Sequence, residues 1–308
     1  MNVMKQIKIF LIILSSILTL VACSKPDSVE HWIDNPTSNE ITLSIDDNQL
    51  TISAKSGIKY KIGYGKHSLS YNNEAVNFVV KPSKREGFIN PTQSNYIFYK
   101  IIYVDDNYAA VVRNVDSYQK DIQYKTPVII NGELHEMEVP FTVINDLFIE
   151  KDTYAWDYFL DEKLPRTVSL KNRSISVQTK LFREDDFLKY MREEGLDQQI
   201  SFPSNRKKFN ELPKTIIPTI DLDSIKCPEG RVDAEKKITA WKQIFNLSGN
   251  DFAEEYDNLT SINSSVAERD IENKCYQDYS DDDGFKEAIN KIYSIYSGKT
   301  YLNFFIVE

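Results

Sequence analysis

The chain has 308 residues and carries 46 acidic against 37 basic side chains, a formal net charge of −9 at pH 7. An anionic protein has no long-range attraction to nucleic acid or to anionic lipid headgroups, so we expect neither as a partner. The length suffices for about two domains with sizeable hydrophobic cores.

The first 22 residues have the three zones of an export signal. Lys5 and Lys8 supply a positive start, and an apolar stretch with a short serine interruption follows over residues 9–22. That stretch is shorter than the ~20 apolar residues that a membrane span needs. The segment Leu20-Val21-Ala22-Cys23 resembles the lipobox of bacterial lipoproteins.

The lipobox resemblance implies that the thiol of Cys23 receives diacylglycerol and that residues 1–22 are removed as a signal peptide. Two or three acyl chains would then hold the protein stably at a membrane of the cell envelope. Ser24, in place of an aspartate after the cysteine, resembles the outer-membrane class of these proteins. The remaining chain would carry 46 acidic and 35 basic residues, since Lys5 and Lys8 are lost.

Only one pair of cysteines remains once Cys23 is used for lipidation. Cys227 and Cys275 lie in no CxxC motif, and no histidine follows His135. In an oxidising envelope an isolated pair is most simply a disulfide, so we predict a Cys227–Cys275 bond. We expect no metal and no cofactor.

The N-terminal part shows alternating apolar and polar residues with a repeat of about nine residues. After a short tether over 23–30, this pattern predicts a small antiparallel β-sandwich or barrel within residues 31–84. The expected strands, separated by turn-forming residues, are 41–45, 50–54, 58–62, 67–71 and 76–80.

A second β-rich region is expected over residues 85–182. Asn131-Gly132 between two apolar runs predicts a tight hairpin over 128–135, since both residues tolerate the positive φ of a type I′ turn. The other expected strands are 96–104, 143–149, 153–158, 167–170 and 175–181.

Residues 183–308 are predicted to be rich in α-helix. Ile238, Trp241, Ile244 and Phe245 are spaced for one helical face, with Asp233 as the expected N-cap. A second helix is predicted over 285–296 and a final strand over 301–307. The chain as a whole is therefore expected to be α+β.

Two groups of residues are candidate binding sites. Tyr154, Trp156 and Tyr158 alternate along a predicted strand, so they share one face. On an exposed face they could stack on sugar or peptide, and on an inward face they are core. The acidic run 278–283 fails the EF-hand pattern, since Asn290 falls where a bidentate Glu is needed. Its carboxylates are better explained as caps of the helix that follows.

Catalytic residues are not predicted. The histidines His31, His67 and His135 are scattered, and the chain contains no GxSxG, HExxH, SxxK or Walker-type loop. Asp34-Asn35-Pro36-Thr37 and Ile89-Asn90-Pro91-Thr92 share Asn-Pro-Thr ahead of each β region. These two segments resemble a family of uncharacterised Gram-negative envelope lipoproteins, which implies location and fold but no activity.

The function expected from these observations is a non-catalytic binding or assembly role in the cell envelope, with an envelope protein as a partner. Two alternatives stay open. The first is a hydrolase that acts on envelope polymers, which would show convergent titratable groups in one pocket. The second is a periplasmic immunity protein, whose acidic surface would suit a basic toxin.

Overall fold

The computed structural model describes residues 26–83, 85–104, 119–170, 175–195, 199–260, 266–279, 284–297, 299 and 302–308. It is α+β, as predicted, with most strands in the N-terminal half and most helices in the C-terminal part. The expected signal peptide and Cys23 lie outside the described residues. Within the described part, no helix combines the length and the apolar character that crossing a bilayer requires.

The strands are β1 (Ser28–Asn35), β2 (Ile41–Ile45), β3 (Asn48–Ile52), β4 (Ser56–Gly63), β5 (Gly65–Tyr71), β6 (Glu74–Val80), β7 (Gly87–Ile89), β8 (Tyr96–Val104), β9 (Tyr124–Ile130), β10 (Glu133–Val139), β11 (Phe141–Ile144), β12 (Phe148–Glu150), β13 (Ile175–Arg183), β14 (Ile200–Ser201) and β15 (Phe304–Val307). The α-helices are α3 (Lys151–Tyr154), α4 (Glu184–Glu193), α5 (Pro228–Gln243), α6 (Gly249–Thr260), α7 (Val266–Asp278) and α8 (Phe285–Ser294). Short 3₁₀ turns are η2 (Phe209–Glu211), η3 (Leu222–Ser224) and η4 (Ile244–Asn246).

The five strands expected between residues 41 and 80 are confirmed as β2 to β6. They belong to two sheets, with strand orders β15-β6-β5-β2-β3 and β12-β7-β1-β4. Ile33 of β1, Leu43 of β2 and Leu69 of β5 are buried in one shared core between these sheets, which is a sandwich. The described residues contain no closed barrel.

Strands β1 to β6 form a first β unit, and strands β7 to β13 form a second one that repeats its strand pairing. In the first, β1 pairs with β4, and β2 lies between β3 and β5. In the second, β7 pairs with β12, and β8 lies between β11 and β13. Because β1 and β7 are parallel neighbours in one sheet, the two units meet along these equivalent strands.

The two Asn-Pro-Thr segments form equivalent turns after β1 and β7. Asn35 Nδ2 donates to the carbonyl of the residue four positions on (2.8 Å), and Asn90 Nδ2 does the same (2.9 Å). Thr37 and Thr92 donate from Oγ1 to the Oδ1 atoms of these asparagines, at 2.8 and 3.0 Å. Both asparagines are fully buried. The shared motif therefore marks a structural repeat.

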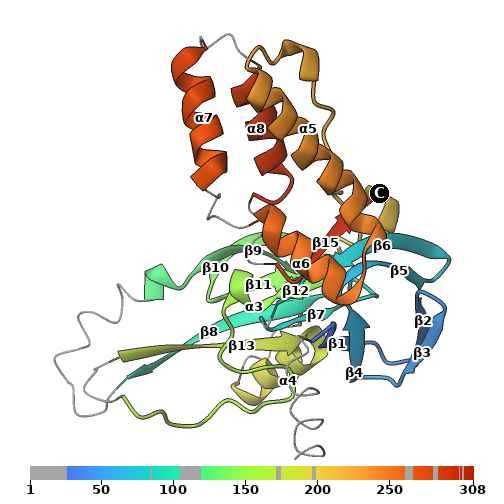
Figure 1. Ribbon diagram of the computed structural model, residues 1–308. Helices are drawn as coiled ribbons and strands as arrows, with labels where there is room; N and C mark the ends of the chain where they lie inside the picture. Colours follow the sequence, from blue (N-terminus) through green and yellow to red (C-terminus); the bar gives the residue numbers. More distant parts are fainter. Residues whose placement is uncertain are drawn as a thin grey trace, which may run out of the picture.

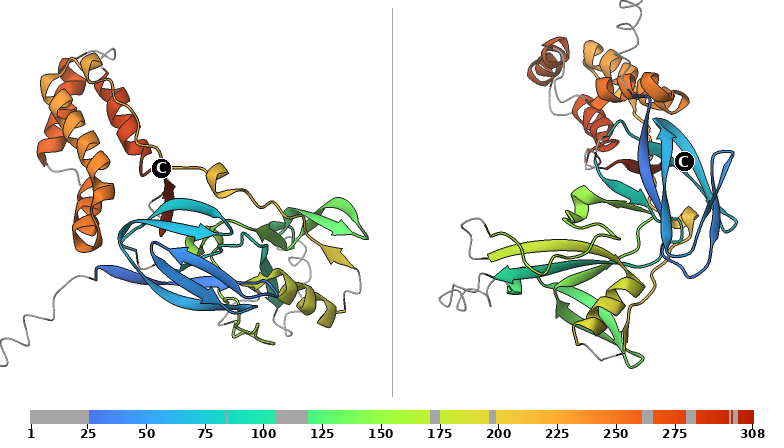
Figure 2. Two further views of the ribbon diagram at one scale, coloured as in Figure 1. Left: turned by 90° about the vertical axis from the view of Figure 1, so that its right-hand side faces the viewer. Right: turned by 90° about the horizontal axis from the view of Figure 1, so that it is seen from below.

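The helices α5, α7 and α8 stand together at one end of the molecule, while β8 and β13 form a long ribbon that points away from them (Figures 1 and 2). The C-terminal strand β15 pairs with β6, so the chain ends where the helical part meets the sandwich. Residues of the first β unit and of α5, α6 and α8 share one hydrophobic core.

Several local predictions need correction. Strand β1 begins at Ser28, inside the tether expected over 23–30, and the strand expected over 143–149 is divided into β11 and β12, which pair with different strands. No strand covers 153–158, because α3 ends at Tyr154 and Ala155 takes a left-handed conformation (φ 50°) that interrupts extended backbone. Residues 167–170 are also irregular. The helix expected to begin after Asp233 begins at Pro228, since proline suits the first helical position. Asp233 instead forms an ion pair with Lys237 one turn on, at 2.8 Å.

The hairpin at Asn131-Gly132 is confirmed, with φ values of 51° and 87°. The expected final strand is confirmed as β15, and the helix expected over 285–296 as α8. The carboxylates proposed to cap α8 fall mainly in 280–283, which lie outside the described residues.

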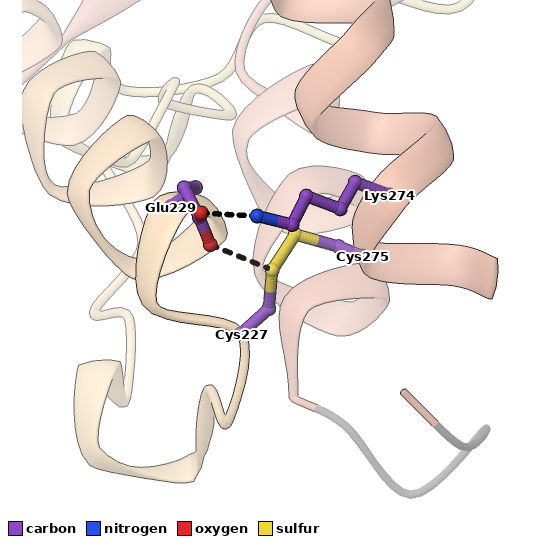
Figure 3. Close-up of a disulfide and its surroundings, with 4 residues drawn as sticks. All are labelled: Cys227, Glu229, Lys274 and Cys275. Carbon is purple, nitrogen blue, oxygen red and sulfur yellow. Dashed lines mark hydrogen bonds and ion pairs between the residues drawn. A yellow bond between two sulfur atoms is a disulfide. The ribbon is translucent and has the colours of Figure 1, made fainter. Parts of the chain in front are cut away.

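The predicted disulfide is present and joins the start of α5 to α7 (Figure 3). The Cα atoms of Cys227 and Cys275 are 5.6 Å apart, and both side chains are buried. Glu229 and Lys274 form an ion pair beside the bond. The link therefore ties two helices of the C-terminal part together.

Candidate binding site

A pocket of about 410 Å³ opens on one face of the sheet β12-β7-β1-β4. It is bordered by strands of the first β unit and by the segment that follows α3 in the second. The lining residues are Val29, Glu30, His31, Trp32, Lys59, Arg85, Glu86, Gly87, Trp156, Phe159 and Asp161. Aromatic rings form much of its wall, and charged side chains form its rim.

The indole of Trp32 lies across the neighbouring strand β4 at Gly57. A Cβ atom built on Gly57 would lie 2.3 Å from Cε2 of the indole, 2.4 Å from Cζ2 and 2.5 Å from Nε1. Cε2 is bonded to the other two atoms, and an approach in the ring plane would bring those two closer than Cε2. Gly57 therefore lies under the face of the ring, and only glycine leaves room for it.

Trp32 is also fixed by a hydrogen bond. Its Nε1–H donates to Oδ1 of Asp34, at 2.9 Å. Asp34 is fully buried and accepts further bonds from Tyr96 Oη (2.7 Å) and from Nε and Nη2 of Arg183 (2.8 and 2.7 Å). This two-bond arginine–carboxylate contact joins the two β units and has defined geometry. The orientation of the Trp32 ring is thus set before any ligand binds.

The opposite wall is formed by Trp156 and Phe159. The Phe159 ring is nearly perpendicular to the Trp32 ring, with centroids 6.3 Å apart and planes at 83°. The buried ammonium of Lys180 holds this segment, since it donates to the carbonyls of Phe159 (2.8 Å), Leu160 (3.1 Å) and Glu162 (2.5 Å). Burial lowers the pKa of Lys180 to about 8.

The charged groups at the rim are compensated within the protein. Glu30 pairs with Lys59 (3.2 Å), Glu86 with Lys151 (2.8 Å) and Asp161 with Arg183 (2.7 Å). Arg85 forms an ion pair with Asp152. The lining has three acidic and two basic side chains, and Arg183 also pairs with Asp34. The rim thus presents hydrogen-bonding groups of both signs with a small negative surplus.

Only one of the three aromatic residues singled out in the sequence lines this pocket. Trp156 does so from the core, with 2% of its surface exposed. The hydroxyl of Tyr154 donates to Asp146 (3.3 Å). The backbone of Tyr158 forms an isolated β-bridge with that of Lys180. The shared face expected for them does not exist, because residues 153–158 are not a strand. Of the aromatic side chains that line the pocket, Trp32 and Phe159 are partly exposed and Trp156 is buried.

Two buried titratable groups lie close to the pocket. Burial lowers the pKa of His31 to about 4, and its ring packs on Phe304 with centroids 4.3 Å apart. Burial raises the pKa of Glu150 to about 7. Oε1 of Glu150 accepts bonds from the backbone amides of Asn303 (2.7 Å) and Phe304 (3.1 Å). Glu150 therefore connects the C-terminal segment to the second β unit by hydrogen bonds.

A smaller pocket of about 280 Å³ lies between α5, α6 and α8 and includes Trp241. Trp241 is 1% exposed, and Tyr296 stacks on its ring with centroids 5.8 Å apart and planes at 13°. Tyr256 meets the same ring edge to face. Trp241 is thus committed to core packing, which distinguishes it from Trp32.

The three histidines lie on the separate strands β1, β5 and β10. In the described residues, no group of three or more His, Cys, Asp or Glu side chains converges to hold a metal ion. The chain matches no protein-family model, no curated protein and no solved structure. The function of the protein is therefore inferred from the geometry of the pocket.

Proposed function

We propose that the chain is a lipid-anchored protein of the cell envelope that binds a ligand at Trp32 and does not transform it. The observation that carries this proposal is the fixed indole ring. Gly57 lies under one face of the ring and Asp34 holds its Nε1, so the ring surface that lines the pocket belongs to its other face and edge. A surface that is rigid before binding loses little conformational entropy when a ligand stacks on it.

The proposed anchor would keep this pocket close to the membrane. Val29, on the pocket wall, lies six residues after Cys23. Six residues of extended chain span at most ~20 Å. Acyl chains on Cys23 would therefore hold the pocket within about that distance of the lipid surface, and Ser24 favours the outer membrane.

A binding role is supported by how the carboxylates of the pocket are used. Glu30, Glu86 and Asp161 each lie in an ion pair with a cationic side chain, so each is engaged in a contact within the protein. Glu150 has a raised pKa, but backbone amides of the C-terminal segment occupy its Oε1. No group here has the setting of a nucleophile with an adjacent base.

The anchor and the pocket can be tested separately in cells. Cys23→Ser should abolish incorporation of labelled fatty acid and leave an uncleaved precursor, and unchanged labelling would refute the anchor. For the pocket, a benzophenone amino acid at Lys59 should give a light-dependent adduct in intact cells. The same amino acid at Asp47, exposed at the turn between β2 and β3, is the control. Equal adducts at both positions, or none at Lys59, would contradict a ligand site at Trp32.

A further inference from the structure

We infer that the ligand class of this pocket is an uncharged sugar ring of an envelope glycan. The inference rests on the proposed function and names the chemistry that the pocket recognises. Two features of the pocket support it: the shape of the Trp32 surface and the charges of the rim.

The shape of the surface favours a flat, partly apolar ring. Trp32 is partly exposed and one face of its ring lies on Gly57. The Phe159 ring, also partly exposed, is nearly perpendicular to it, at 83°. The indole therefore offers a flat surface beside a second aromatic ring. A pyranose has an apolar face of C–H groups that can lie on an indole, and its hydroxyls project outward around the ring plane towards the rim.

The charge balance of the rim favours a neutral ligand. Each rim charge lies in an ion pair, and the acidic side chains are in slight excess because Arg183 also serves Asp34. An anionic ligand is therefore disfavoured, and a cationic ligand would have to compete with Lys59, Lys151 and Arg183 for the carboxylates. Hydroxyl groups both donate and accept. A sugar can therefore donate to Glu30 and accept from Lys59 while these two residues remain paired.

A proline-rich peptide is the main competitor, since proline rings also stack on aromatic grooves. Proline has no backbone N–H, so such a segment offers acceptors to the two cations of the rim but no donor to its three carboxylates. Five of the eleven lining residues are charged, which also argues against a deep anchor for an apolar side chain. The rim thus favours the sugar over the peptide.

The test is calorimetric titration of the purified mature protein with three glycan probes and one peptide probe. The glycans are peptide-free peptidoglycan strands, a β-1,4-linked N-acetylglucosamine tetramer and oligosaccharide released from the cell's own outer surface. The peptide is a proline-rich decamer. We expect at least one glycan to bind, with affinity reduced tenfold or more in both Trp32→Ala and Gly57→Ala.

Two control variants show whether the loss of affinity is specific to the Trp32 ring and its contact with Gly57. Trp32→Phe preserves a ring and should retain part of the affinity. Gly63 lies on the same strand as Gly57, and a Cβ added there would come no closer than 3.9 Å to Asp27 and His67, so Gly63→Ala should bind like the parent. Affinity for a glycan that Trp32→Ala leaves unchanged would overturn the inference.

The remaining outcomes separate the inference from the proposed function. Binding of the proline-rich peptide without binding of any glycan overturns the sugar assignment and leaves a ligand site at Trp32. No glycan binding, together with no Lys59-specific adduct in cells, overturns both.

Discussion

The face of the Trp32 indole lies on Gly57 of the adjacent strand, close enough that a single added methyl group would overlap three ring atoms. This contact explains why a large aromatic ring can lie flat on an open sheet face in one orientation. The same ring is held at its nitrogen by Asp34. Backbone shape and a buried ion pair together create the surface on which binding is proposed to occur.

Gly57→Ala should displace the Trp32 ring. The added Cβ would lie 2.3 Å from Cε2, so the ring must swing outward, at a cost of about 1–3 kcal/mol in the free energy of unfolding. Quenching of tryptophan fluorescence by acrylamide should increase. Gly63→Ala should change neither quantity, and equal behaviour of the two variants would show that the Gly57 contact is unimportant.

Asp34→Ala should be strongly destabilising. It leaves the Arg183 guanidinium, which is 3% exposed, without its main partner, and such a loss costs about 3–5 kcal/mol. Asp185→Ala is the matched control, because it removes a solvent-exposed ion pair with Lys55, and such pairs contribute little to stability. Urea unfolding of both variants measures the difference. A loss below about 1 kcal/mol for Asp34→Ala would contradict a structural role for the pair.

Glu150 predicts a pH dependence with a definite sign. Burial raises its pKa from 4.5 to about 7 in the folded state. Between these values the folded state holds a proton that the unfolded state has lost, so this contribution to stability is complete below pH 4.5 and is lost as pH rises through about 7. The pKa difference corresponds to about 3 kcal/mol.

Glu150→Gln provides the comparison, since glutamine does not titrate. The free energy of unfolding should fall more steeply between pH 4.5 and 7 in the parent than in the variant. Parallel pH profiles would mean that Glu150 titrates at its ordinary pKa. The comparison of slopes cancels any constant cost of the substitution itself.

The Cys227–Cys275 bond spans 48 residues, for which the loop-entropy model gives about 4 kcal/mol of stabilisation. The double variant Cys227→Ala/Cys275→Ala should lose stability of that order, and reduction should have no further effect on it. Labelling of the denatured, unreduced protein from the envelope should find neither thiol free. Two labelled thiols would contradict the bond in the native protein.

Local patterns in the sequence were sufficient for most of the sandwich and for the hairpin. Strands β2 to β6 alternate with period two and are separated by turn residues, so neighbouring residues alone specify them. Asn131-Gly132 specified its turn for the same reason. Strand β1 was not predicted, because its partners β4 and β7 come from other segments of the chain.

The pocket could not be predicted for a related reason. Its wall combines Trp32, Lys59, Gly87 and Phe159 from four separate segments, and no local motif links them. The alternation of Tyr154, Trp156 and Tyr158 was misleading, since Ala155 breaks the strand geometry on which a shared face depends. A signal was present in the alternation of Glu30, Trp32 and Asp34, which placed an aromatic side chain between two charged ones.

The most direct test of the account is acrylamide quenching of tryptophan fluorescence, with and without the bound glycan. The chain has three tryptophans, and Trp156 and Trp241 are 2% and 1% exposed, so the quenchable emission comes from Trp32. We predict that the glycan protects this emission in the parent and in Gly63→Ala, and that Trp32→Phe has little quenchable emission to protect. Quenching that is unchanged in the parent at a saturating concentration of a glycan that binds would contradict the claim that Trp32 is the binding surface.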